Sequence, residues 1–307
     1  MSQPKRVVVT GATGLIGSAL CRQLLAQGYA PVVFARNLEQ ARKKVPGMAD
    51  YVMWEASEDG PWAAAIDGAY AVINLAGPSL ANKRWSAAYK QYVQQARVIG
   101  TRGIVNAIAK ANEKPQVLLS GSAVGYYGHR DDTPLDEQSP PGTDFLAQLC
   151  QAWEHEALKA QSYGVRTVVL RTGIVLDKKG GALPLLALPF RFFVGGPVLP
   201  GTQWMPWIHI ADEVGLIIAA LEQPQLRGPL NLSAPHPMRN RDFSKAVGEA
   251  LHRPSLFPVP GFALRIIVGE FAESLTTGQR VLPVRAEKIG YQFKFPELQG
   301  ALNDLLR

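Results

Sequence analysis

Three glycines near the start of the chain, Gly11, Gly14 and Gly17, have the spacing of a loop that binds phosphate groups. They follow the β-branched run at 7–9 and precede an apolar pattern typical of a helix. In this setting the first glycine makes a tight turn, the second lets the backbone approach a pyrophosphate, and the third lets the helix pack on its strand. The free N–H groups at the helix start attract the phosphates. These residues predict a dinucleotide-binding site.

Arg36 indicates which dinucleotide is bound. It follows Ala35 at the end of the second strand-like run, where dinucleotide folds face the ribose of the adenosine. An acidic residue at this place accepts from the ribose hydroxyls, whereas an arginine pairs with a 2′-phosphate. No Asp or Glu precedes Glu39. We therefore predict NADP(H) rather than NAD, with a solvated strand-end arginine as the alternative interpretation of Arg36.

Strand-like apolar runs alternate with helical stretches through the first part of the chain. This alternation predicts an α/β fold, a doubly wound parallel sheet of Rossmann type whose ligand lies over the carboxyl ends of the strands. We expect the NADP-binding domain to span 1–176, with 208–233 returning to it. The expected strands are 7–10, 32–35, 51–54, 71–75, 117–120 and 165–170.

The rest of the chain is expected to form a smaller, substrate-side lobe from 177–207 and 234–307. Residues 180–207 are rich in glycine, proline and aromatics, which excludes one long helix or a central strand. We expect loops and short helices that roof the ligand crevice, with Trp204 and Trp207 as flat walls; a packed surface excursion is the alternative. Helices are expected near 85–111, 242–251, 262–273 and 297–306, and one capped by Asn37.

Composition limits the class of protein. The 307 residues are 47% hydrophobic and 19% charged, and no segment approaches the roughly 18 consecutive apolar residues of a membrane span. Because the N-terminus lacks a cationic and apolar leader, we expect a soluble, cytoplasmic protein with no membrane partner. Two cysteines exclude a disulfide framework or a cysteine metal cluster. The formal charge of +7 suits an anionic ligand; because the basic residues are scattered, we expect no nucleic-acid partner. The oligomeric state stays open.

Five segments, in this order, resemble the extended, nucleotide-sugar-epimerase-like branch of the short-chain dehydrogenase/reductase superfamily: 10–17, 74–77, 120–128, 170–175 and 207–212. The stretch 258–296 resembles the C-terminal extension, of unknown function, of an atypical subgroup. The resemblance implies cofactor contacts at Gly11, Thr13, Gly14, Leu15, Ile16, Gly17, Ala35, Arg36, Asn74, Leu75, Ala76, Gly77, Ser120, Arg171 and Ile174.

The catalytic residues of that family are mostly replaced. Members normally use Tyr-x-x-x-Lys, in which the lysine lowers the pKa of the tyrosine, but no tyrosine here has a lysine four positions on. With Glu154 aligned to the acidic residue that often follows the motif, Leu146 stands at the tyrosine place and Cys150 at the lysine place. Arg97 stands where an asparagine is usual. Of the usual four catalytic groups, only Ser122 remains.

Five residues are therefore candidates for the catalytic chemistry. Ser122 would hydrogen-bond the reacting oxygen, Tyr126 or Arg97 would stabilise its charge, and Cys150 could act as an acid. Tyr126 or Tyr127 could also be the proton donor. Tyr126 as a crevice wall and Cys150 as a packed thiol are the alternatives. We expect an NADP(H)-dependent oxidoreductase or epimerase-like enzyme for a carbonyl or hydroxyl carbon of a small substrate, with anionic and nucleotide-linked compounds as candidates. The alternative is a non-catalytic NADP(H)-binding sensor or interaction protein.

Overall fold

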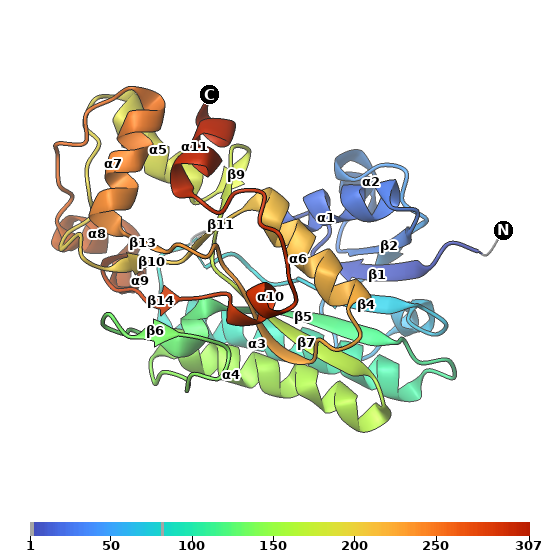
Figure 1. The fold of residues 1–307 in the computed structure, drawn as a ribbon. Helices are drawn as coiled ribbons and strands as arrows, with labels where there is room; N and C mark the ends of the chain where they lie inside the picture. The colour runs from blue at the N-terminus through green and yellow to red at the C-terminus, as the bar shows by residue number, and fades with distance from the viewer. Residues whose placement is uncertain (1–2, 81–82) are drawn as a thin grey trace.

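The computed structural model describes residues 3–80 and 83–307, and its centre is a seven-stranded parallel sheet. The predicted α/β, doubly wound fold is confirmed (Figure 1). Along the sheet the order is β12 (Gly228–Leu232), β7 (Arg166–Thr172), β5 (Val117–Ala123), β4 (Ala71–Asn74), β1 (Arg6–Thr10), β2 (Ala30–Ala35) and β3 (Asp50–Met53).

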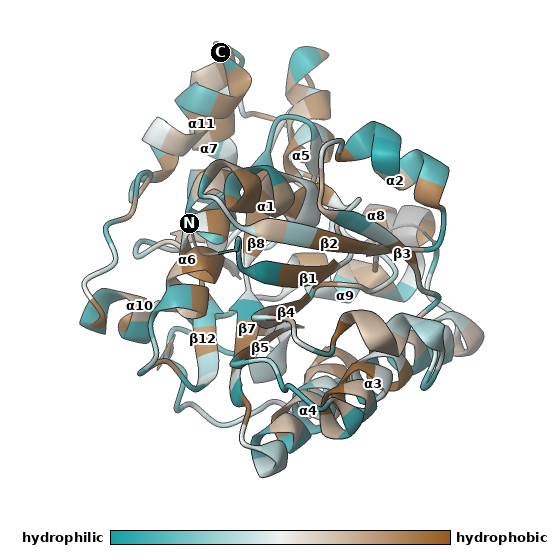
Figure 2. Ribbon diagram, turned by 90° about the vertical axis from the view of Figure 1, so that its right-hand side faces the viewer, coloured by the Kyte–Doolittle hydropathy of each residue, from teal (hydrophilic) through white to brown (hydrophobic). Residues whose placement is uncertain are grey.

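Helices cover both faces of this sheet, because the strands carry apolar side chains on each side. Figure 2 shows the brown, apolar strands between the two helical layers. One face packs on α1 (Leu15–Ala26), α2 (Leu38–Lys44), α6 (Ile210–Glu222) and α10 (Val284–Lys288). The other packs on the 3-10 helices η1 (Pro61–Ala65) and η3 (Lys159–Tyr163), α3 (Ala87–Lys110) and α4 (Phe145–Leu158).

The order of the strands indicates where a ligand crevice is expected. β1 pairs with β2 on one side and with β4 on the other, so the connections from these strands leave in opposite directions. A crevice opens at the carboxyl ends of the strands at such a point. The predicted cap of the second helix is confirmed, since the Asn37 side chain accepts from Gln40 N at 2.8 Å.

The smaller lobe has its own apolar core, formed mainly by α5 (Leu183–Arg191), α7 (Asn240–Leu251) and α11 (Leu298–Leu306). The prediction for Trp207 was wrong: its side chain is fully buried in this core and donates to His236 O, so it forms no crevice wall. The remaining strands are β6 (Pro134–Leu135), β8 (Ile174–Asp177), β9 (Gly180–Gly181), β10 (Trp204–Met205), β11 (Trp207–His209), β13 (Met238–Arg239) and β14 (Arg280–Val281).

The helix expected over 262–273 is broken. It divides into α8 (Gly261–Val268), the 3-10 turn η4 (Gly269–Phe271) and α9 (Ala272–Thr276). Gly269 ends α8 with a φ of +66°, a backbone conformation that residues other than glycine rarely adopt. Within the described ranges, no helix has the length and apolarity needed to cross a membrane.

Candidate functional site

The glycine loop between β1 and α1 is shaped by close backbone contacts. Gly11 has a φ of +68°, and a Cβ there would lie 2.7 Å from the carbonyl carbon and oxygen of Leu75. A Cβ on Gly17 would lie 2.2 Å from Gly11 O. Any side chain at these two positions would push α1 or the loop after β4 away. Gly14 is exposed at the N-terminus of α1, where N–H groups without helical partners face the crevice.

Most of the other predicted cofactor residues border the same edge of the sheet. Leu75, Ala76 and Gly77 continue from the end of β4, and Ile174 begins β8. Thr13, Leu15 and Ile16 are half-buried around the start of α1. Ala35 is buried at the end of β2, and the Arg36 side chain beyond it is exposed. At this edge a dinucleotide would contact backbone groups, small side chains and the exposed guanidinium of Arg36.

Asn74 and Ser120 have side chains inside the protein rather than in the crevice. Asn74 accepts from Thr10 Oγ1 at 2.7 Å and donates to Thr101 Oγ1 at 2.9 Å, which ties β1, β4 and α3 together. Ser120 is fully buried, and its hydroxyl has no partner among residues 3–80 and 83–307. Cofactor contacts by these side chains stay predictions.

Ser122 and Cys150 are adjacent at the end of β5. The Ser122 hydroxyl donates to Glu154 Oε1 at 2.6 Å, and it also lies within hydrogen-bond reach of the Cys150 thiol. Cys150 lies one helical turn before Glu154 on α4 and is 2% exposed. Burial, with a smaller contribution from the Glu154 charge, raises the pKa of this thiol to about 12. Cys150 is therefore a protonated, packed thiol at neutral pH and no nucleophile.

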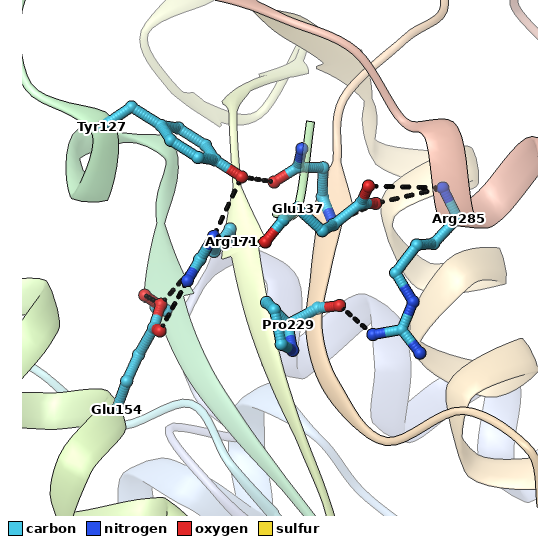
Figure 3. Close-up of polar contacts among 8 residues, drawn as sticks. Tyr127, Glu137, Glu154, Arg171, Pro229 and Arg285 are labelled. Atoms are coloured by element: carbon cyan, nitrogen blue, oxygen red, sulfur yellow. Dashed lines mark hydrogen bonds and ion pairs between the residues drawn. The ribbon is translucent and has the colours of Figure 1, made fainter. Parts of the chain in front are cut away.

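Glu154 also holds Arg171 in a buried ion pair (Figure 3). Two Arg171 nitrogens donate to the two carboxylate oxygens at 2.9 Å each, and a third donates to the Tyr127 hydroxyl at 3.0 Å. Burial alone would lower the pKa of Arg171, but the hydrogen bonds and charge of Glu154 outweigh it and raise the pKa. Arg171 is 3% exposed, so its predicted cofactor contact stays a prediction.

The network extends from Tyr127 to the C-terminal part of the chain. Tyr127 donates to Asn231 Oδ1 at 2.7 Å, and burial raises the pKa of its phenol to about 12. Glu137 accepts from the backbone N–H groups of Asn231 and Arg285, and Arg285 in turn donates to Pro229 O (Figure 3). These contacts fasten α10 to β12 beside the candidate site.

Tyr126 differs from its neighbour Tyr127. Its ring is half-buried, in the 3-10 turn η2 (Val124–Tyr127), with the Arg171 guanidinium carbon 3.4 Å from the ring centre. Within the described part of the chain its hydroxyl has no hydrogen-bond partner. The phenol is thus positioned by its ring while its O–H remains available.

Arg97 is a half-buried cation near this edge. Its guanidinium donates to Pro78 O at 2.9 Å and to Val93 O at 3.3 Å, and lies 5.2 Å from the Trp153 ring centre. A Cβ on Gly77 would be 2.9 Å from its central carbon. Burial lowers the pKa of Arg97, and no carboxylate in the described ranges pairs with it. A cation in such surroundings attracts an anionic group.

Three members of this network were missed by the sequence interpretation as site residues: Glu154, Asn231 and Glu137. Glu154 left a detectable signal, because it interrupts the apolar face of α4 with a carboxylate four positions after Cys150. A charged residue at such a position is buried only when it is paired. Its partner Arg171 lies on another strand, so the pairing could not be inferred from spacing.

Comparison with known proteins agrees with this architecture. A family model described as the NAD dependent epimerase/dehydratase family matches residues 7–232. The chain belongs to this family. A second model, a domain of unknown function called DUF1731, matches residues 259–305. The epimerase-like resemblance and the C-terminal extension seen in the sequence are both confirmed.

Related epimerase family proteins cover almost the whole chain. The Arabidopsis thaliana protein called epimerase family protein SDR39U1 homolog, chloroplastic, is 41% identical over 303 residues, which cover 98% of this chain and 86% of the relative. Epimerase family protein YfhF of Bacillus subtilis is 36% identical over 301 residues, covering 98% and 97%. The crystal structure of human epimerase family protein SDR39U1 with NADPH is 35% identical, with a TM-score of 0.87 and 98% coverage of both chains.

Proposed function

We propose that this chain is an NADP(H)-dependent oxidoreductase or epimerase-like enzyme that acts on a carbonyl or hydroxyl carbon of a small, anionic substrate, with nucleotide-linked compounds as one candidate class. Support for NADP(H) comes from the glycine loop, from the exposed Arg36 at the end of β2 and from the human relative crystallised with NADPH. The nicotinamide supplies the hydride chemistry, and the protein supplies orientation and electrostatics.

The observation that carries this proposal is the enclosed Arg97 guanidinium. It lies against Gly77 and donates to two backbone carbonyls, with no carboxylate partner in the described part of the chain. Fixed positive charge in a site of low dielectric stabilises negative charge that develops on an oxygen. Arg97 would therefore bind an anionic oxygen, either of the substrate or of the reacting centre.

Ser122 and Tyr126 would handle the proton at the reacting oxygen. Because the Ser122 hydrogen is bound by Glu154, its oxygen is arranged to accept from a substrate hydroxyl. Tyr126 has an unengaged O–H beside the charged Arg171 and is our candidate proton donor. Cys150 takes no part in this proposal, since burial raises the pKa of its thiol to about 12 and makes it a weak proton donor.

The test of this proposal is NADPH oxidation, followed by loss of absorbance, with a panel of carbonyl substrates. We expect turnover with at least one carboxylated, phosphorylated or nucleotide-linked carbonyl, reduced about 100-fold by Arg97→Met and less by Arg97→Lys. Tyr126→Phe should reduce turnover about 100-fold while NADPH binding stays unchanged. Tyr126→Phe without effect would remove Tyr126 from the mechanism, and equal activity of Arg97→Met would overturn the role of Arg97.

Cofactor choice is tested separately at Arg36. Arg36→Glu should weaken NADPH binding far more than NADH binding, because the substituted carboxylate repels the 2′-phosphate. Arg22→Glu on the exposed side of α1 makes the same change in charge away from the end of β2 and serves as the matched control. Equal effects of Arg36→Glu on both nucleotides would contradict the assignment.

A non-catalytic NADP(H)-binding sensor or interaction protein is the second candidate. It is favoured by Leu146 and Cys150 at the places of the usual tyrosine and lysine, and by the engagement of Ser122 with Glu154. A sensor should bind NADPH and NADP+ with different affinities and turn over nothing in the panel. We also propose a cytoplasmic location, supported by two buried free cysteines, and no nucleic-acid partner.

A further inference from the structure

The far end of the smaller lobe carries a group of exposed apolar side chains, which we call the apolar tip. Its members come from α5, from the loop that follows α5, from the loop before α8 and from α8 itself. Their side chains are between 42% and 71% exposed: Leu185, Leu188, Phe192, Phe193, Val194, Leu199, Leu256, Phe257, Phe262 and Ile266. Single exposed apolar residues are ordinary on proteins, but a group of this size marks an interaction surface.

Two chain segments are joined into one surface here. Leu256 N and Phe257 N both donate to Gly195 O, at 3.0 and 3.1 Å, and Leu199 N donates to Val259 O at 2.9 Å. Figure 1 shows the two loops running side by side to α8, at the end of the molecule away from the N-terminus. The apolar side chains of these two loops are therefore held next to one another.

Exposed basic side chains lie within the apolar tip. Residues 183–199 and 252–268 contain Arg191, Arg253 and Arg265, all exposed, and no aspartate or glutamate. Glu249 and Glu270 border these segments and lie near Arg253 and Arg265. Arg253 lies over the Phe193 ring, 4.4 Å from its centre.

We propose that the apolar tip docks on an anionic phospholipid surface. Phe262 and Ile266 are four residues apart on α8, so they share a face, and Arg265 is placed to meet lipid phosphates. Buried apolar side chains together with nearby basic residues are the combination that binds a helix to a membrane surface. This docking requires no spanning helix. It revises the expectation of no membrane partner, which considered spanning segments and leader peptides.

The test is co-sedimentation of the full chain with vesicles of phosphatidylcholine, with and without phosphatidylglycerol. We expect binding to the anionic vesicles, reduced about tenfold or more by the double variant Phe262→Ser/Ile266→Ser. Leu25→Ser/Met53→Ser, which replaces exposed apolar residues on α1 and β3, away from the apolar tip, is the control and should bind like the unmodified chain. Equal unfolding midpoints in urea establish that both variants are folded.

Charge provides an independent arm of the test. Arg253→Glu/Arg265→Glu should weaken binding by about fivefold or more for each arginine, whereas Arg22→Glu/Lys44→Glu, with the same net charge, should retain most of it. The proposal is overturned if no vesicle binds, or if both vesicle types bind equally and the serine variant has no effect. It is also overturned if the chain is a dimer that Phe262→Ser/Ile266→Ser dissociates, or if the tip binds an acidic protein segment but no vesicle.

Discussion

Two buried glutamates flank the end of β7, and they are held in different ways. Adjacent residues of a strand point to opposite faces of the sheet, so Arg171 faces α4 and Thr172 faces α6. Arg171 pairs with Glu154 through two hydrogen bonds. Thr172 donates to Glu213 Oε1 at 2.9 Å, while Glu213 Oε2 has no partner within the described residues.

The carboxyl groups of Glu154 and Glu213 have different neighbours. A guanidinium compensates the Glu154 carboxylate, and the Ser122 hydroxyl adds a further donor. Glu213 is fully buried and accepts a hydrogen bond from the Thr172 hydroxyl. Burial raises the pKa of this carboxyl to about 8. Glu154 thus lies in an ion pair on the α4 face, whereas burial without a charged neighbour favours the neutral form of Glu213 on the α6 face.

Breaking the charged pair should have the largest effect. Glu154→Ala leaves the Arg171 guanidinium buried and unpaired, and should reduce the free energy of unfolding by about 3–5 kcal/mol. Glu154→Gln keeps an acceptor and should cost less. Urea unfolding of both variants measures the difference. A loss under about 1 kcal/mol for Glu154→Ala would show that Arg171 finds water or another partner.

The protonated carboxyl of Glu213 should make the free energy of unfolding depend on pH. The unfolded chain releases the Glu213 proton near the ordinary value of 4.5, whereas the folded chain holds it to about pH 8. The stabilising effect of this proton is full below the lower value and is lost as pH rises through the upper one, and about 3 kcal/mol of it is lost between pH 4.5 and pH 7. Urea unfolding at several pH values should show this loss, and Glu213→Gln should remove most of it. An unchanged pH dependence in Glu213→Gln would contradict the assignment.

Substitution of Ser122 measures how much its hydroxyl contributes to the stability of the Glu154–Arg171 pair. Ser122→Ala should destabilise the fold by about 1–2 kcal/mol, because Glu154 loses one hydrogen bond and keeps its ion pair. The loss should shrink when Glu154 is already glutamine, which a double-mutant cycle measures. Additive losses from the two substitutions would show that Ser122 and Glu154 are not coupled.

Substitutions of Tyr127 and Tyr126 should give the smallest changes in the free energy of unfolding. Tyr127→Phe removes a hydroxyl bonded to Arg171 and Asn231, and should reduce the free energy of unfolding by about 1 kcal/mol. Tyr126→Phe keeps the ring over Arg171 and should leave stability unchanged. Thermal or urea unfolding of the pair compares them. Equal losses would mean that the Tyr126 hydroxyl is engaged after all.

Local signals in the sequence predicted the framework well. The glycine spacing placed the loop between β1 and α1, and Asn37 with Gln40 placed the start of α2. These signals are readable because the interacting groups lie within a few residues of each other. The prediction for Trp207 was wrong because nothing nearby in the sequence shows that its ring is enclosed by helices from the second half of the chain.

What the sequence determined by itself is the α/β fold, the glycine loop and the replacement of the usual tyrosine and lysine. Each follows from residue type, spacing or periodicity along a short stretch. Only the tertiary structure decided that Glu154 lies in an ion pair, and that Glu213 and the half-buried Arg97 have no oppositely charged partner among the described residues. The reason is physical: charge state and hydrogen-bonding capacity depend on burial and on partners supplied by distant strands and helices, and sequence spacing does not encode those distances.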